Sequence, residues 1–192
     1  MRPSLGWRSK TIMSKPDFGV RTVFLVGFMG AGKSSVGLAL SRKLGWAFED
    51  LDELIESQEQ RSIEQIFEQS GEAGFRQIEH AALRSLVLSL GSSGKIVAVG
   101  GGAFVQPNNA ALLQDLGLLT IFLDAPVEEL FRRCQEQRLP RPLRRDLQEF
   151  RRLYNDRRAL YLKARDRIET SGKSVEQIAG EVIEKLRLQA SV

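Results

Sequence analysis

The sequence predicts an α/β fold built on a parallel sheet, and three observations carry that prediction. Short apolar, partly β-branched runs alternate along the chain with longer segments of helical periodicity. The first run, Val23–Val26, is followed at once by a glycine-rich turn and then by a helical segment. Hydrophobic residues make up 42% and charged residues 27%, which is typical of a globular chain rather than a disordered one.

Strand and helix segments follow one another in order. Apolar runs predict five strands, of which the last is the least apolar, at 23–26, 46–48, 96–99, 118–123 and 167–169. Helical periodicity predicts helices at about 33–44, 72–90, 127–136, 146–164 and 175–188. Gly45 is expected to end the first helix, and Ser62–Gln65 resembles a capping box that opens another. The length of 192 residues fits one domain.

Composition excludes several classes of protein. No run reaches the roughly 18 apolar residues that a membrane span needs. The single cysteine, Cys134, cannot form an internal disulfide, and one histidine, His80, is too few for a zinc cluster or a histidine-based triad. We therefore expect a soluble, cytoplasmic protein without a membrane partner.

The net charge of +4 is concentrated at the N-terminus. Residues 1–21 hold five basic residues and one acidic residue, so the rest of the chain is neutral overall. Residues 132–167 hold 13 basic and five acidic residues, which suits a small anion better than a nucleic acid. We expect residues 1–20 to be a leader that is either disordered or absent from the translated protein, with Met13 as the start. A targeting segment is the alternative.

A phosphate-binding loop is the most specific motif. Residues 27–34 match the pattern G-x-x-x-x-G-K-[ST], with a strand before it and a helix after it. Glycines let several backbone N–H groups point at one anion, and the helix adds its positive dipole end. Lys33 is expected to reach the β- and γ-phosphates, and the Ser34 hydroxyl to bind Mg²⁺. A dinucleotide-binding fingerprint is not supported, because the glycine spacing differs.

Two aspartates follow the second predicted strand. Asp50 and Asp52 are two residues apart, and in an extended chain such side chains point to the same side. Ligands of open α/β sheets bind at this end of the strands. We expect Asp50 on the metal side and Asp52 facing a hydroxyl that is to be phosphorylated. Crowding of acidic residues on a surface turn is the alternative.

Arginines and a glycine run complete the set of candidate residues. Arg76 and Glu79 stand at i and i+3 of one predicted helix, Arg141 lies between two prolines, and Arg157 lies on a later helix. The planar guanidinium suits carboxylates and phosphates, although a solvated helix face is the ordinary alternative for each arginine. The run Gly100–Gly102 allows the backbone to approach a ligand.

Together these motifs resemble the shikimate kinase family over about residues 23–186. The segments that carry the resemblance are 27–37 (GFMGAGKSSVG), Asp50-Leu-Asp52, 71–79 (GEAGFRQIE), Gly100–Gly102, Arg141-Pro-Leu143 and Arg157-Arg-Ala-Leu-Tyr161. The resemblance implies transfer of the ATP γ-phosphoryl group to the 3-hydroxyl of shikimate, in the chorismate pathway to aromatic amino acids. It also implies a P-loop fold of the nucleoside monophosphate kinase type, with three α/β/α layers and a five-stranded parallel sheet in residues 21–190.

The resemblance also implies roles on the acceptor side. Asp52 matches the aspartate that binds the reacting hydroxyl, and Arg76 and Arg157 match the pair that binds the shikimate carboxylate. Gly101 and Gly102 match glycines that touch the substrate. The substrate-binding segment would span about 51–80.

On the nucleotide side, the resemblance implies one Mg²⁺ ion held by Ser34 and Asp50, and a lid at about 135–147. Lys33, Asp52 and Arg141 are the implied catalytic residues. The implied ATP-binding residues are Gly30, Ala31, Gly32, Lys33, Ser34, Ser35, Arg133 and Arg141. The partners would be ATP and shikimate, with the protein a monomer.

Three departures and two alternatives accompany the resemblance. Ser35 stands where the family usually has threonine. The lid is slightly longer than usual between Arg133 and Arg141, and the adenine loop near 170–175 lacks a proline often present there. One alternative is another small-molecule kinase of the same fold, for gluconate or a nucleotide. The other is a kinase-like binding protein without activity.

Overall fold

Five parallel strands in the order β2-β3-β1-β4-β5 form the centre of the protein. The computed structural model describes residues 21–136 and 146–190. The elements are β1 (Thr22–Val26), α1 (Lys33–Leu44), β2 (Ala47–Asp50), α2 (Leu51–Glu59), α3 (Ile63–Leu88), β3 (Lys95–Ala98), α4 (Pro107–Asp115), β4 (Leu119–Asp124), α5 (Val127–Glu136), α6 (Leu147–Tyr161), β5 (Asp166–Glu169) and α7 (Val175–Ala190). The predicted leader at 1–20, Arg141 and most of the predicted lid lie outside the described residues.

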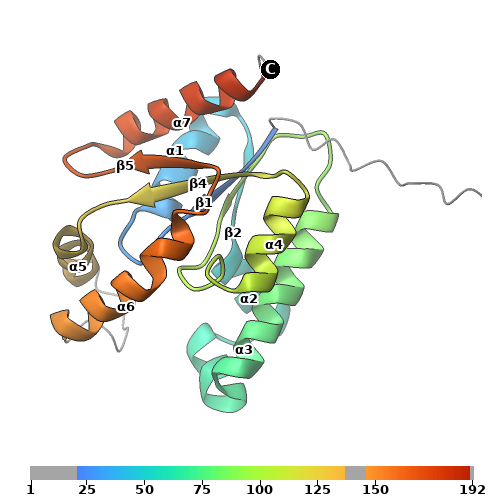
Figure 1. The fold of residues 1–192 in the computed structure, drawn as a ribbon. Helices are drawn as coiled ribbons and strands as arrows, with labels where there is room; N and C mark the ends of the chain where they lie inside the picture. The colour runs from blue at the N-terminus through green and yellow to red at the C-terminus, as the bar shows by residue number, and fades with distance from the viewer. Residues whose placement is uncertain (1–20, 137–145, 191–192) are drawn as a thin grey trace, which may run out of the picture.

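Helices cover both faces of the sheet, which confirms the predicted three-layer architecture. Figure 1 shows α1 and α7 together on one side of the sheet and α3 and α4 on the other. Helices α5 and α6 stand near the carboxyl ends of β4 and β5 (Figure 1). This arrangement leaves the loops after the strands at one edge, where open α/β sheets bind their ligands.

Burial explains which strands were easiest to predict. Every residue of β1 and β4 is buried, so these central strands are nearly continuous apolar runs. Only Ile168 is buried in β5, which lies at an edge of the sheet and pairs with β4 alone. The edge position accounts for the weak apolar signal of that strand.

The structure corrects three predicted element boundaries. Asp52 lies in the first turn of α2 rather than in extended chain, so the same-side argument for Asp50 and Asp52 was wrong. The two helices expected from Ser62 and from about 72 join into one element, α3, with a kink between them at Gly71, where φ is 66° and ψ is −178°. Helix α4 was not predicted, although Pro107 at its first turn is a usual start signal.

Helix ends follow the local sequence signals. Ser62 and Gln65 form the predicted capping box at the start of α3. Gly45 ends α1 in the left-handed conformation, with φ 66°. Ser62 thus fixes where α3 begins, and Gly45 fixes where α1 ends before β2.

Candidate active site

The loop between β1 and α1 has the backbone of a phosphate-binding loop. Gly30 and Gly32 have φ of 80° and 86°, which favours glycine. A Cβ at Gly30 would lie 2.6 Å from the carbonyl oxygen of Leu130, so the close packing of α5 also requires glycine there. The Lys33 ammonium donates to the carbonyl oxygens of Gly27 at 3.0 Å and Phe28 at 3.2 Å. Lys33 is thus held over the loop that it is expected to serve.

Ser34 and Asp50 come together beside this loop. The Ser34 hydroxyl donates to Oδ2 of Asp50 at 2.6 Å, although the residues are 16 apart in the sequence. The other carboxylate oxygen of Asp50 accepts from the Asp52 backbone N–H at 3.0 Å and caps α2. The two residues predicted for the metal therefore form a preorganised pair of oxygen donors. Ser35 follows on α1 and is exposed, and Ala31 is buried within the loop.

A second group of candidate residues surrounds the glycine run after β3. A Cβ at Gly100 would lie 2.5 Å from Oδ1 of Asp52, and a Cβ at Gly102 would lie 2.6 Å from Nη2 of Arg76. Asp52 and Arg76 therefore pack directly against the glycine backbone from the α2 and α3 side. Gly101 faces the phosphate loop, because a Cβ there would lie 3.6 Å from the Met29 backbone nitrogen. The glycine run is where the phosphate loop and the acidic and basic side chains adjoin.

Glu79 is a site residue that sequence reasoning did not select. It accepts from Nη1 of Arg76 at 2.9 Å, and its side chain is only 1% exposed. Burial raises the pKa of Glu79, the Arg76 guanidinium and Arg157 oppose that rise, and Asp52 adds to it. The i, i+3 spacing to Arg76 was visible in the sequence, but the burial that makes this carboxylate part of the site was not.

Arg76 has a partly satisfied guanidinium. Its Nη groups donate to Glu79 and, at 3.3 Å, to Glu72, and its Cζ lies 5.1 Å from the centroid of the Phe75 ring. Within residues 21–136 and 146–190, the buried Nε of Arg76 has no hydrogen-bond partner. A buried donor without a partner is costly unless a ligand accepts from it.

Arg157 reaches the same site from α6. It is half-buried, and its positive charge opposes the rise that burial causes in the pKa of both Glu79 and Tyr161. Arg76 likewise acts on Tyr161, so the two predicted carboxylate-binding arginines face one group of residues. Two guanidinium groups therefore lie beside the buried Glu79 carboxylate.

His80 and Asn109 support the glycine run from behind. The His80 Nδ1 and the Asn109 Oδ1 lie 2.7 Å apart and join α3 to α4. The Asn109 amide donates to the carbonyl oxygen of Ala103 at 3.0 Å, and Asn109 is fully buried. The only histidine therefore serves a structural contact next to Gly102.

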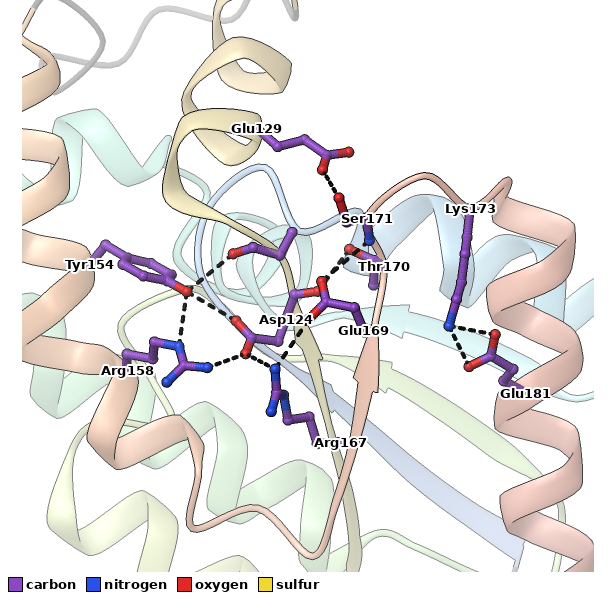
Figure 2. Close-up of polar contacts among 11 residues, drawn as sticks. Asp124, Glu129, Tyr154, Arg158, Arg167, Glu169, Thr170, Ser171, Lys173 and Glu181 are labelled. Carbon is purple, nitrogen blue, oxygen red and sulfur yellow. Dashed lines mark hydrogen bonds and ion pairs between the residues drawn. The ribbon is translucent and has the colours of Figure 1, made fainter.

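Arg133 lies apart from that group, at the loop that follows β5. It donates to Glu129 at 2.5 Å, to the Thr170 hydroxyl at 3.2 Å and to the Thr170 carbonyl oxygen at 3.1 Å. Ser171 donates to Glu129 at 2.5 Å, a contact that Figure 2 shows. The Ser171 hydrogen bond lowers the pKa of Glu129, and Arg133 adds to this effect. Arg133 thus fastens α5 to the 170–175 loop, where the adenine contacts are expected.

Arg158 does not belong to the predicted substrate site, although it follows Arg157. It donates to Oδ2 of Asp124 at 2.8 Å, and Arg167 donates to the same oxygen at 2.9 Å. The Tyr154 hydroxyl donates to Oδ1 of Asp124 at 3.1 Å and accepts from Arg158 at 3.0 Å (Figure 2). Asp124 is 2% exposed, so this network ties α6 and β5 to the end of β4.

The phosphate loop thus lies between the Ser34–Asp50 pair on one side and the Asp52, Arg76 and Glu79 group on the other. This arrangement is typical of kinases that transfer a phosphoryl group from a nucleotide to a small acceptor.

Comparisons with known proteins give the family. The sequence model of the family described as shikimate kinase matches residues 29–187. A shikimate kinase of Geobacter sulfurreducens is 44% identical over 173 residues, which cover 88% of this chain and 92% of that protein. One from Persephonella marina is 38% identical over 168 residues, 88% of this chain and all of that protein. The crystallised shikimate kinase of Acinetobacter baumannii in complex with shikimate superposes with a TM-score of 0.79 at 32% identity, over 91% of this chain and 97% of that one. The chain belongs to the shikimate kinase family.

The family and fold expectations are thereby confirmed, including an ATP-dependent transfer to a hydroxyl group. The residue roles within the site stay predictions. Among the described helices, none is long and apolar enough to cross a membrane.

Proposed function

We propose that this chain phosphorylates the 3-hydroxyl of shikimate with ATP, and that residues 21–190 form the catalytic domain. The observation that carries the assignment of the acceptor site is the group of Arg76, Glu79 and Arg157 beside Gly100–Gly102. Arg76 keeps a buried Nε without a partner among the described residues. The carboxylate of shikimate would accept from that donor and from Arg157, and charge-assisted bonds of this kind contribute about 1.5–3 kcal/mol each.

Asp52 serves the other end of the acceptor. Its carboxylate lies against Gly100, on the side of the glycine run where α2 begins. In this position the Asp52 carboxylate accepts a hydrogen bond from the 3-hydroxyl. This bond points the hydroxyl oxygen at the phosphorus atom that it attacks. A side chain at Gly100 would strike Asp52, and one at Gly102 would strike Arg76. Glycine at these positions therefore leaves room for the backbone of Gly101 and Gly102 to lie against the acceptor. The acceptor is thus fixed at both ends, which reduces the entropy cost of the transfer.

The phosphate loop binds the nucleotide. Backbone N–H groups of Gly30, Ala31 and Gly32 are proposed to hold the phosphates, and Ser35 to add a hydroxyl at the start of α1. Lys33 would leave the carbonyl oxygens of Gly27 and Phe28 for the β- and γ-phosphate oxygens. The phosphate oxygens would then be charged partners for the ammonium.

Ser34 and Asp50 fit a magnesium ion. Their oxygens already lie 2.6 Å apart beside the loop, and Mg²⁺ prefers a few oxygen ligands from the protein together with phosphate oxygens. When bound, the ion neutralises charge that builds up on the phosphates. The role of the protein is to keep the Ser34 hydroxyl and the Asp50 carboxylate on the same side of the nucleotide.

Arg133 and Arg141 are proposed for the nucleotide side. Arg133 contacts Thr170 at the start of the 170–175 loop, which suits a place near the base. Arg141 and most of the proposed lid at 135–147 lie outside the described residues. We propose that this lid meets the transferring phosphate and excludes water, with residues 51–80 as the acceptor-binding segment. We further propose a cytoplasmic monomer.

An ADP-release assay with ATP and Mg²⁺ tests the proposal. Shikimate, gluconate and several nucleoside monophosphates are offered as acceptors, with an acceptor-free control. ADP release that depends on shikimate supports the proposed reaction. Release with gluconate or a nucleotide instead would keep the phosphate loop and reject the roles of Arg76 and Arg157. Folded protein that binds ATP and releases no ADP with any acceptor would favour a kinase-like binding protein.

A further inference from the structure

Tyr161 is the last residue of α6 and is fully buried. Its ring stacks on Phe122 of β4, with centroids 5.2 Å apart and an interplanar angle of 22°. The ring packing explains why an aromatic residue stands here. It does not explain why that residue carries a hydroxyl in the interior.

The hydroxyl joins two parts of the acceptor site. It donates to the carbonyl oxygen of Gly101, which lies 60 residues away in the sequence. Arg157, one turn earlier on α6, lies close enough to the phenol for its positive charge to oppose the raised pKa of Tyr161. The hydroxyl therefore binds the glycine run directly and lies beside an arginine that is proposed for the substrate carboxylate.

Without Tyr161, the Arg157 guanidinium and the Gly101 peptide could each adopt other conformations. A guanidinium on a helix surface has many rotamers, and fixing it costs side-chain entropy. Gly101 is half-buried and has no side chain to restrain its peptide, and without this donor its carbonyl oxygen would lose a hydrogen bond. The Tyr161 hydroxyl limits the conformations of both groups before the substrate binds.

We propose that Tyr161 is a positioning residue for shikimate, which sets the Arg157 guanidinium and the Gly101 peptide in register with each other. The inference rests on the proposed function, since it assigns the Arg157 group to the substrate carboxylate. Tyr161 acts through these two residues and does not touch the reacting atoms.

The hydroxyl stays protonated at any working pH. Burial raises the pKa of Tyr161 to about 12, although Arg157 and Arg76 pull it down and Glu79 pushes it up. The group is therefore a permanent donor to Gly101 rather than a switch.

The chain supplies its own matched control. It holds two tyrosines, and both lie on α6 with a buried hydroxyl. The Tyr154 hydroxyl donates to Asp124 and to the carbonyl oxygen of Ala125 and accepts from Arg158, none of which is proposed for the acceptor site. Figure 2 shows its contacts with Asp124 and Arg158. Tyr161→Phe and Tyr154→Phe each remove one buried hydroxyl from the same helix and leave the ring in place.

The experiment measures kcat and KM for both substrates in the two variants, with the melting temperature of each. Tyr161→Phe is expected to raise the KM for shikimate roughly five- to tenfold, which corresponds to the loss of one hydrogen bond to a neutral carbonyl oxygen. Its KM for ATP should stay within about twofold of the wild type, since the phosphate loop keeps its other contacts. Tyr154→Phe should lower the melting temperature without moving the KM for shikimate.

A double-mutant cycle separates positioning from general weakening. In an Arg157→Ala background, Tyr161→Phe should raise the KM for shikimate by clearly less than it does in the wild type, since only the contact with Gly101 is then lost. An unchanged KM in Tyr161→Phe, an equal rise in Tyr154→Phe, or additive effects in the cycle would each overturn the proposal. Equilibrium titration of shikimate gives the same comparison for a variant with low turnover. A wild-type protein that does not turn over shikimate would refute the proposed function itself. An active wild type together with an unchanged KM for shikimate in Tyr161→Phe would refute only this inference.

Discussion

The substitution Gly102→Ala tests how tightly the glycine run and Arg76 fit together. The new Cβ would lie 2.6 Å from Nη2, 2.7 Å from Nη1 and 2.9 Å from Cζ of Arg76. Ordinary contacts of a Cβ begin at 3.4 Å. The guanidinium must therefore retreat by about 0.8 Å, the difference between 3.4 and 2.6 Å.

This displacement should affect binding more than folding. Gly102 does not have the left-handed backbone that disfavours alanine, and the atoms in the way are the far end of a flexible side chain. We expect the free energy of unfolding to change by less than about 1 kcal/mol. Because misplacement of a positioning group by about 1 Å can cost as much as 100-fold, the KM for shikimate should rise about tenfold or more. The KM for ATP should not change.

Steady-state kinetics with shikimate varied at saturating ATP measure the effect, and urea unfolding measures stability. Gly91→Ala is the matched control, since a Cβ there meets nothing within 4 Å and its backbone is also outside the left-handed region. In an Arg76→Ala background, Gly102→Ala should have little further effect. A KM for shikimate within twofold of the wild type, in a folded Gly102→Ala protein, would refute the contact as an element of substrate binding.

Three further predictions concern the phosphate loop and the carboxylates. Lys33→Ala should lower kcat by at least about 100-fold, because the β- and γ-phosphates lose their cation; near-normal turnover would reject that role. Asp52→Asn should lower kcat by about 100-fold or more with ATP affinity unchanged, and weaker ATP binding with normal kcat would contradict its place on the hydroxyl side. Glu79 has a raised pKa in the folded protein, so it binds protons more strongly there than in the unfolded chain. Its contribution to stability is therefore fully present below the ordinary pKa near 4.5 and is lost as pH rises through the raised value. Urea unfolding of wild type and Glu79→Gln across this range should show the wild type losing stability relative to the variant as pH rises, and a constant difference would count against the raised pKa.

Local signals made the phosphate loop predictable. The residues of the loop are contiguous, and each has a reason that depends only on its neighbours: glycines for left-handed backbone, Lys33 and Ser34 at the start of a helix. The strand before the loop is apolar throughout because it lies at the centre of the sheet. Sequence spacing was therefore enough for this half of the site.

The acceptor half depends on contacts between distant segments. Asp52 was selected for a wrong reason, since it follows the strand as the second residue of α2 and not as extended chain. It still lies at the carboxyl edge, because Asp50 caps that helix at the end of β2. The position was predictable from the edge of the sheet, and the conformation was not.

The burial of polar groups was the property that the sequence predicted least well. Glu79 has an ordinary helical spacing to Arg76, and only its packing against the end of β3 shows that it is a buried carboxylate. The sequence likewise indicates only an aromatic core residue at Tyr161, whereas the structure shows that its hydroxyl donates to the carbonyl oxygen of Gly101. Helix α4 was missed because its apolar pattern is weak, yet its Asn109 secures the glycine run through Ala103.

A comparison of shikimate with its methyl ester as acceptors tests the central claim most directly. The ester keeps the ring and the hydroxyls and removes the charge that Arg76 and Arg157 are proposed to bind. With two charge-assisted contacts at about 1.5–3 kcal/mol each, wild-type kcat/KM should fall by at least about 100-fold for the ester. The ratio should shrink strongly in Arg76→Ala. Equal kcat/KM for the acid and the ester in the wild type would contradict a carboxylate site at these arginines.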